Sequence, residues 1–303
     1  MEIKALKDLL PYCLENCTKK TLAVIKAEDD HTLTAVARAR KEGAIDAVLI
    51  GDAAVIKGLL AQIGEKEEDY RIIDEADERE AILKAIELVH AGEVDFLMKG
   101  LLETKNLMSA IVAKTSGMRT GRLMSKFDFV EIAQYHKLIA LTDSALNTKP
   151  DVEAKKQIIQ NALDVMYSVG IRRPKIAVLA ASETLNPKLQ ESADAWKLKQ
   201  MWENGEFTDC YLEGPISIDL ALEKESVKIK NYQSPVGGDA DMLVCPDLVS
   251  GNMMGKMMTI CGGRAAGIIV GAKVPIVLMS RAAEIDDKFQ SIILGAIASQ
   301  KGA

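Results

Sequence analysis

The sequence lacks the long apolar run that a membrane-spanning helix needs. Such a helix takes about 18 or more consecutive apolar residues, and no run in this chain reaches that length. The first residues, MEIKALKDLLPYCLENC, carry charges throughout and contain no apolar stretch typical of a signal peptide. Both absences predict a cytoplasmic protein that does not enter a membrane.

The chain also has few residues of the kinds that bind metals or form disulfides. Its five cysteines are an odd number, and only Cys13 and Cys17 lie close together, without C-x-x-C spacing. The three histidines occupy unrelated positions. We therefore predict no metal site, and we expect reduced, mostly buried thiols.

Three signatures of nucleotide or nucleophile chemistry are absent as well. The segment GNMMGK at 251–256 is one residue short of the phosphate-binding loop G-x-x-x-x-G-K-[ST], and Met257 replaces its hydroxyl. There is no G-x-G-x-x-G after a predicted strand and no G-x-S-x-G. The first absence argues against a nucleotide triphosphatase. The other two mean that the chain has neither a dinucleotide-binding fingerprint nor a nucleophile elbow.

What is present is the composition of a globular protein. Hydrophobic residues make up 48% and charged residues 27% of 303 positions, which suffices for a sizeable core. This length predicts about two domains. The net charge of −6 argues against nucleic acid or an acidic membrane surface as a partner.

Apolar strands alternate with amphipathic helices along the chain, which predicts an α/β fold with a largely parallel sheet covered on both faces. Continuous apolar strands such as KIAVLAA (175–181) indicate burial on both sides. A polar stretch at 142–151 predicts a domain boundary. The predicted strands are 21–27, 46–51, 70–74, 95–100, 136–142, 175–181, 211–219, 241–246, 268–271 and 274–279.

The strand at 274–279 leads directly into Ser280 and Arg281, and a helix with an apolar face follows from Ile285. Ligands of open α/β sheets bind at the carboxyl ends of strands, and helix N-termini favour anions. Asp287 lies in the first turn of that helix. The three side chains are therefore the candidate catalytic group.

Each of the three residues has a chemical use. Arg281 can bind a phosphate bidentately, and Ser280 can donate to a carbonyl oxygen that gains charge in a transition state. Asp287 can act as a base if burial raises its pKa. The alternative stays open at this point: Asp286 and Asp287 stabilise the helix N-terminus, while Arg281 forms a surface ion pair.

The charge is uneven between residues 99 and 126. This segment contains six basic residues and one acid, Glu103. A positive patch suits a polyphosphate ligand, and a solvated basic face is the alternative. The basic residues are Lys99, Lys105, Lys114, Arg119, Arg122 and Lys126.

A predicted helix at 250–261 is rich in methionine. Met253, Met254, Met257 and Met258 favour core packing or a subunit interface. The wall of an acyl-chain pocket is the alternative.

Three segments resemble the phosphate acetyl/butyryltransferase family. They are MKGLLETKNLMSA (98–110), PDLVSGNMMGKMM (246–258) and GGRAAGIIVGAKVPIVLMSRA (262–282). The resemblance covers essentially the whole chain. The MKG–TK segment and the length of 303 residues look more like the butyryltransferase branch.

The resemblance implies two αβα domains with the active site in the cleft between them, similar to the isocitrate/isopropylmalate dehydrogenase architecture. One domain would comprise 1–142 and 281–303, closed by the C-terminal helix, and the other 143–280. The resemblance also implies a homodimer or higher homo-oligomer.

The implied reaction is acyl-CoA + phosphate ⇌ CoA + acyl phosphate, by direct attack in a ternary complex. Coenzyme A is a substrate, and no metal or redox cofactor is expected. By this resemblance, Ser280 polarises the acyl carbonyl, Arg281 holds the phosphoryl group and Asp287 deprotonates the CoA thiol, with Asp286 as the less favoured base. The residues expected to bind substrate are Lys99, Thr104, Arg119, Arg122, Ser125, Lys126, Asp247, Asn252 and Lys256.

Butyryl transfer is the favoured activity, and acetyl transfer by the same residues is the nearest alternative. A non-catalytic CoA-binding protein is a third possibility. A dehydrogenase of the same architecture would need a cluster of aspartates for a metal and a nucleotide site, and the sequence shows neither.

Overall fold

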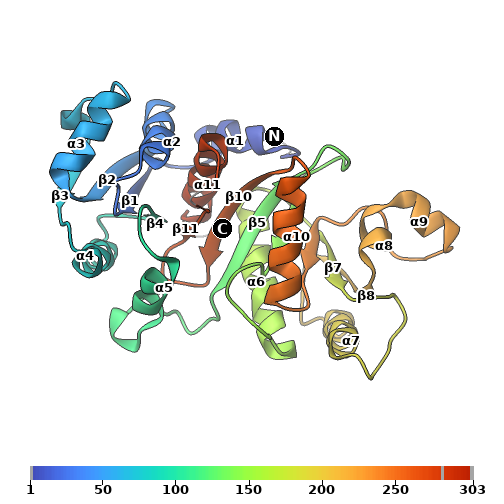
Figure 1. The fold of residues 1–303 in the computed structure, drawn as a ribbon. Coiled ribbons are helices and arrows are strands. Elements are labelled where there is room, and N and C mark those ends of the chain that lie inside the picture. Colours follow the sequence, from blue (N-terminus) through green and yellow to red (C-terminus); the bar gives the residue numbers. More distant parts are fainter. Residues whose placement is uncertain (1–2, 281–282, 301–303) are drawn as a thin grey trace. The chain divides into compact units, whose positions relative to one another are not determined.

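The structure is a computed structural model that describes residues 3–280 and 283–300. The chain forms two compact units, shown in Figure 1. Unit 1 comprises Met1–Leu6 and Leu123–Ala265, and unit 2 comprises Lys7–Arg122 and Ala266–Ala303. Both have a sheet covered by helices, which confirms the α/β class. The division into domains at residues 142 and 280 stays a prediction.

Unit 2 contains a sheet in the order β3-β2-β1-β4-β11-β10. All neighbouring strands are parallel except β10 and β11, which are antiparallel. The strands are β1 (Lys20–Ile25), β2 (Ile45–Gly51), β3 (Arg71–Asp74), β4 (Phe96–Lys99), β10 (Arg264–Val270) and β11 (Ile276–Val277).

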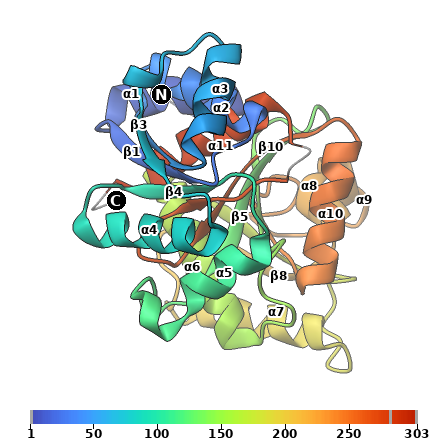
Figure 2. The same ribbon diagram turned by 60° about the vertical axis from the view of Figure 1, so that its left-hand side comes forward.

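The helices of unit 2 form two groups. Helix α11 packs against α1 and α2, and α4 packs against α5 (Figures 1 and 2). Aspartates cap the first turns of α2, α3 and α4 by accepting backbone N–H groups. The helices are α1 (Leu9–Asn16), α2 (Asp30–Lys41), α3 (Ala53–Gln62), α4 (Glu78–Ala91), α5 (Thr104–Val112) and α11 (Ile285–Ala298), with 3-10 turns at Leu6–Asp8, Glu67–Asp69 and Lys114–Ser116.

The strand order of unit 2 reverses between β1 and β4. From β1 the chain moves outward to β2 and β3, and then returns to place β4 on the other side of β1. Ligands of open α/β sheets bind outside the strand ends at such a switch point. Gly100 follows β4 there, and a Cβ at Gly100 would lie 2.0 Å from the Lys26 carbonyl oxygen, so only glycine fits.

Unit 1 contains a sheet in the order β5-β6-β9-β7-β8, in which β5 and β6 are antiparallel and the other pairs are parallel. Its strands are β5 (Ser125–Glu131), β6 (Ile139–Thr142), β7 (Lys175–Leu179), β8 (Tyr211–Ile216) and β9 (Met242–Val244). Its helices are α6 (Val152–Ser168), α7 (Gln190–Glu203), α8 (Ile218–Leu222), α9 (Lys224–Ile229) and α10 (Leu248–Ile260).

The structure corrects several predicted boundaries. No strand was expected at Ser125–Glu131, because Lys126 and Asp128 make it look polar, yet the two form an ion pair within β5. The strand expected at 136–142 begins only at Ile139. The strand expected at 274–279 is limited to Ile276–Val277.

The helices were also compared with the requirements for crossing a membrane. Within residues 3–280 and 283–300, no helix combines the length and apolar character needed to cross a bilayer.

Candidate functional site

A small cavity lies at the switch point of unit 2. Because β1, β4 and β11 are parallel, their carboxyl ends share one edge of the sheet. The cavity measures about 60 Å³, and residues that follow all three strands line it. Its polar lining consists of Asp29, Thr32, Lys99, Ser280 and Lys288.

Two of the residues proposed from the sequence meet in this cavity. Ser280 is exposed and follows β11. Lys99 is the last residue of β4, only 8% exposed, and its Nζ donates to the Gly100 carbonyl oxygen at 3.1 Å. A hydroxyl and a buried ammonium group therefore line one space, which suits an anionic or carbonyl ligand.

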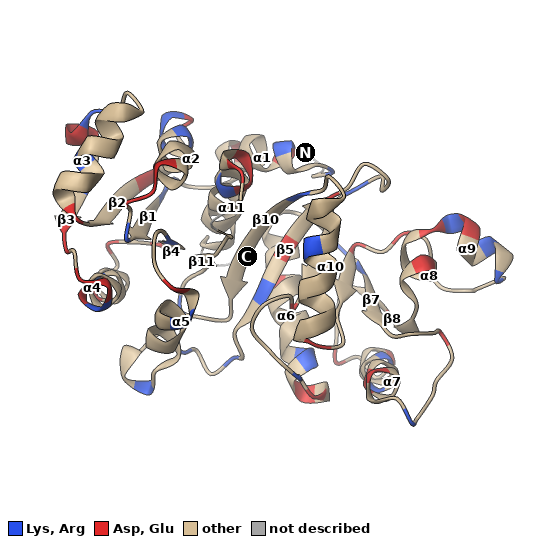
Figure 3. Ribbon diagram, viewed as in Figure 1, with Lys and Arg blue, Asp and Glu red and all other residues tan. Residues whose placement is uncertain are grey.

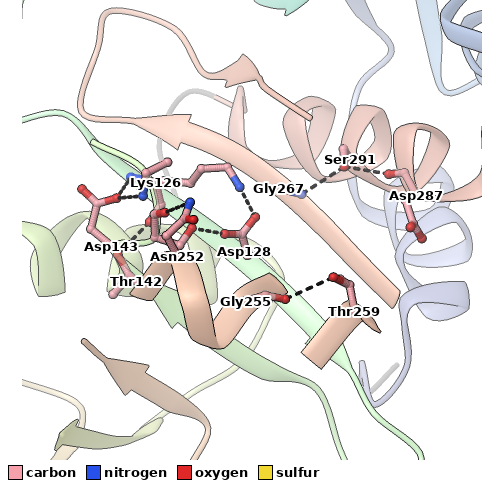
Figure 4. Close-up of polar contacts among 12 residues, drawn as sticks. Lys126, Asp128, Thr142, Asp143, Asn252, Gly255, Thr259, Gly267, Asp287 and Ser291 are labelled. Carbon is pink, nitrogen blue, oxygen red and sulfur yellow. Dashed lines mark hydrogen bonds and ion pairs between the residues drawn. The ribbon is translucent and has the colours of Figure 1, made fainter. Parts of the chain in front are cut away.

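The adjacent carboxylates of α11 differ in their surroundings. Asp286 is exposed and forms an ion pair with Arg38 at 2.5 Å, while Asp287 is 8% exposed. The Ser291 hydroxyl donates to the Asp287 carbonyl oxygen at 2.7 Å and accepts from the Gly267 N–H at 3.0 Å (Figure 4). Ser291 thus attaches the first turn of α11 to β10. Arg281 lies outside the described residues.

Lys288, Asp29 and Thr32 were not among the residues proposed from the sequence. Lys288 is 4% exposed, and its Nζ donates to Asp29 Oδ2 at 2.8 Å and to Thr32 Oγ1 at 3.2 Å. Asp29 also caps α2 by accepting from the Thr32 N–H at 2.9 Å. Burial alone would raise the pKa of Asp29, but hydrogen bonds from Lys288 and Thr32 and the Lys288 charge lower it.

A signal for Asp29 was present in the sequence. Asp29 stands between a predicted strand and a predicted helix, as Ser280 does. The same rule on strand ends would have selected it. Lys288 could not be found in this way, because only the packing of α11 on α2 brings its side chain to Asp29.

Three further predicted residues of unit 2 lie elsewhere. Thr104 begins α5, and Arg119 and Arg122 lie in the following loop. All three are exposed, and none lines the cavity beside Ser280.

In unit 1, Lys126 and Asn252 belong to one polar cluster. Lys126 forms an ion pair with Asp128, and the Ser144 hydroxyl donates to Asp128 Oδ2 at 2.6 Å. Asn252 Nδ2 donates to the Ser144 carbonyl oxygen at 3.2 Å (Figure 4). The Lys126 charge is therefore paired within the protein, and a role of Lys126 in substrate binding stays a prediction.

Ser125 lies deeper in unit 1. It is 1% exposed, and its hydroxyl accepts from Asn161 Nδ2 at 3.1 Å. The nearby Asp143 carboxylate accepts the backbone N–H of Lys126 at 3.1 Å and that of Ala145 at 3.0 Å. Asp143 and Ser144 were missed because the segment after 142 was interpreted as a domain boundary.

Asp247 and Lys256 belong to α10. Asp247 is the N-cap, and the backbone N–H of Ser250 donates to its Oδ1 at 2.8 Å. That hydrogen bond is the main reason why the pKa of Asp247 is lowered. Lys256 is exposed and is the only Lys or Arg in α10 (Figure 3). Asp247 thus stabilises the first turn of α10, and its role in substrate binding stays a prediction.

The donors for a metal do not come together in the described part of the chain. Among residues 3–280 and 283–300, no group of three or more His, Cys, Asp or Glu side chains is placed to hold a metal ion.

Known proteins resemble the chain over most of its length. The family described as Phosphate acetyl/butaryl transferase matches residues 54–296. A phosphate butyryltransferase of Clostridium acetobutylicum is 37% identical over 92% of this chain and 93% of its own. A phosphate acetyltransferase of Thermotoga maritima is 36% identical over 92% of this chain and 95% of its own. A crystal structure of a branched-chain phosphotransacylase from Enterococcus faecalis V583 superposes with a TM-score of 0.82, at 29% identity over 92% of this chain and 99% of its own.

Proposed function

Since the chain belongs to the phosphate acetyl/butaryl transferase family, we propose that it transfers a short acyl group, preferably butyryl, between CoA and inorganic phosphate. The cavity of unit 2 is the observation that supports specific residues for this reaction. Ser280 and two buried lysines line it at the switch point. A carbonyl group and an anionic phosphate are the substrate parts that such a lining favours.

The proposed step joins the CoA sulfur to the acyl carbon. Asp287 takes the thiol proton, and the thiolate attacks the carbonyl carbon of the acyl phosphate. The Ser280 hydroxyl donates to the carbonyl oxygen as its negative charge grows. The bond between that carbon and the phosphate oxygen then breaks, and phosphate leaves with the electron pair while Arg281 holds it. The reverse reaction forms acyl phosphate and returns the proton from Asp287 to CoA.

Burial supports Asp287 over Asp286 as the base. A base shielded from water can take a proton from a bound substrate without competition from solvent. Asp287 is 8% exposed, whereas Asp286 is exposed and forms an ion pair with Arg38.

The finer architecture belongs to the same proposal. We expect two αβα domains of the isocitrate/isopropylmalate dehydrogenase type, divided at residues 142 and 280. The protein would be cytoplasmic, would use CoA as a substrate and would need no metal or redox cofactor. Dialysis against a chelator should leave turnover unchanged, and a crystal structure with bound CoA would test the architecture.

The acyl preference decides between butyryl and acetyl transfer. Purified protein would be given butyryl-CoA, isobutyryl-CoA or acetyl-CoA with phosphate, and free thiol would be followed with a disulfide reagent. Each methylene changes specificity by about 10–200-fold, and acetyl is shorter than butyryl by two, so butyryl-CoA is expected to react fastest and acetyl-CoA slowest. Fastest release from acetyl-CoA would keep the mechanism and change the substrate. Binding of CoA without any phosphate-dependent release would instead indicate a non-catalytic CoA-binding protein.

We also propose a homodimer in which α10 contacts the second copy. Met254 and Met258 pack against the core of unit 1, but a second stripe of α10, at intervals of three or four residues, is at least 60% exposed: Val249, Met253, Met257 and Ile260. A solvent-exposed apolar stripe of this kind is typical of an interface. Light scattering should give twice the chain mass, and Met253→Lys should lower it to one chain.

A further inference from the structure

Lys288 is a buried cation that the reaction proposed above does not use. An ammonium group has three N–H donors. Among the residues that the structure describes, only two acceptors take hydrogen bonds from it: Asp29 Oδ2 at 2.8 Å and Thr32 Oγ1 at 3.2 Å. One donor therefore remains for a ligand, and Lys288 lines the cavity beside Ser280.

The charge of the cavity lining favours an anion. Lys99 and Lys288 carry two positive charges, and both side chains are buried. Asp29 supplies one negative charge, so the charged lining is net positive. Charges shielded from water interact strongly, so an anion placed beside Lys288 would be attracted to its ammonium group.

The size of the cavity limits the choice of anion. Its volume is about 60 Å³. At roughly 10–15 Å³ per water-sized atom it has room for about five non-hydrogen atoms, the number in a phosphate group. A whole nucleotide is too large for this space.

Asp29 and Thr32 hold the ammonium group of Lys288 in place. Asp29 is the N-cap of α2 and Thr32 lies in its first turn, where the Asp29 carboxylate accepts from the Thr32 N–H at 2.9 Å. The pKa of Asp29 lies below its ordinary value because the hydrogen bonds outweigh the effect of burial. Asp29 therefore stays ionised at neutral pH and fixes a cation that faces the cavity.

We propose that Lys288 binds the phosphate group of the substrate beside Ser280, with Asp29 and Thr32 as positioning residues. This inference rests on the acyl-transfer function proposed above. It adds to the reaction a substrate-binding residue, Lys288, one position beyond the proposed base.

The test measures the affinity for inorganic phosphate by calorimetry in Lys288→Gln. Glutamine keeps a hydrogen-bond donor for Asp29 but removes the charge. Loss of a charged hydrogen bond should weaken phosphate binding about 10–100-fold. The KM for phosphate should rise by a similar factor, while the KM for butyryl-CoA changes less than about threefold.

A matched control comes from the other unit. Lys155 is also buried, at 3% exposure, and pairs with Asp194 at 2.8 Å. Lys155 does not line the cavity. Lys155→Gln should therefore leave phosphate affinity within about twofold, since substitutions at independent sites do not influence each other. Wild-type phosphate affinity in Lys288→Gln would overturn the proposal, as would an equal loss in Lys155→Gln. A loss of CoA affinity instead of phosphate affinity would also overturn it.

A second measurement uses the unaltered protein, in case Lys288→Gln does not fold. Lysines would be acylated with a succinimidyl ester and quantified by mass spectrometry, with and without phosphate. Phosphate should slow labelling of Lys288 several-fold and leave Lys155 unchanged, and equal labelling of Lys288 in both samples would contradict the proposal. Phosphate binding without acyl transfer from any acyl-CoA would refute the proposed function but not this site.

Discussion

The adjacent carboxylates Asp286 and Asp287 have the same side chain but different surroundings in the structure. Each was a candidate base or a stabiliser of the helix N-terminus. The ion pair with Arg38 engages Asp286 at the surface, while Asp287 is buried and its backbone is fixed through Ser291. Residue type therefore predicted the pair, the family resemblance favoured Asp287, and packing supports the same choice.

Substitution of Ser280 or Asp287 should reduce turnover without unfolding the protein. Ser280→Ala removes a donor to the developing oxyanion, which costs roughly 100–1,000-fold in kcat. Asp287→Asn removes the proposed base, at a cost of roughly 100–10,000-fold. Initial rates of CoA release, together with thermal melting curves, would measure both effects.

Asp286→Asn is the informative comparison for Asp287→Asn. It alters the same helical turn and the same local charge. A small effect of Asp286→Asn together with a large effect of Asp287→Asn would support the assignment. The opposite result would transfer the role of base to Asp286, and wild-type rates in all three variants would end the mechanism.

At the scale of elements, an ionic cluster fixes the amino ends of three strands in unit 1. Asp239 precedes β9 and forms ion pairs with His136, with Lys137 and with Lys175 at the start of β7. Lys137 lies just before β6 and also pairs with Asp241 at 2.6 Å. Burial alone would raise the pKa of Asp239, but hydrogen bonds from the basic residues lower it to about 2.

The free energy of unfolding should depend on this carboxylate in acid. Because the pKa of Asp239 is lowered in the folded state, its carboxylate stabilises the protein at pH values above the ordinary pKa of 3.8. This stabilisation is lost as the pH falls towards about 2. Wild type should therefore exceed Asp239→Asn by about 2 kcal/mol at pH 7. Denaturant titrations at several pH values should show the difference shrinking between about pH 4 and pH 2.

The exposed pair of Asp46 and Lys19 offers a control for this titration. The Asp46 side chain is 59% exposed, and Asp46→Asn should change the free energy of unfolding by less than about 1 kcal/mol. A difference between wild type and Asp239→Asn that stays constant from neutral pH to pH 2 would contradict the electrostatic explanation.

Elements with continuous apolar character could be predicted from the sequence, and elements with buried polar residues could not. The strand at 46–51 was predicted almost as it appears in β2 (Ile45–Gly51). Strand β5 was missed because Lys126 and Asp128 compensate each other inside the fold. Short-range patterns report on burial only when the buried side chains are apolar.

At the scale of the whole molecule, the family was recognised from three sequence segments, and the α/β class was predicted from the alternation of strands and helices. Of the polar residues that line the cavity, Lys99 and Ser280 were proposed from the sequence, but Asp29, Thr32 and Lys288 were not, because the lining comes from three separate parts of the chain. The order of the parallel strands and the packing of α11 on α2 bring them together. Strand order and helix packing decide which residues come together in the cavity. The pattern of residues along the sequence therefore indicates only those at the ends of predicted strands.

The most direct test of the central claim is to detect the acyl phosphate itself. Purified protein would be incubated with butyryl-CoA and inorganic phosphate, and the mixture would be followed by ³¹P NMR. We expect a new acyl-phosphate resonance that grows in step with free CoA thiol and that grows roughly 100–1,000-fold more slowly with Ser280→Ala. Release of CoA without that resonance would show hydrolysis instead of transfer to phosphate, and it would contradict the proposed function.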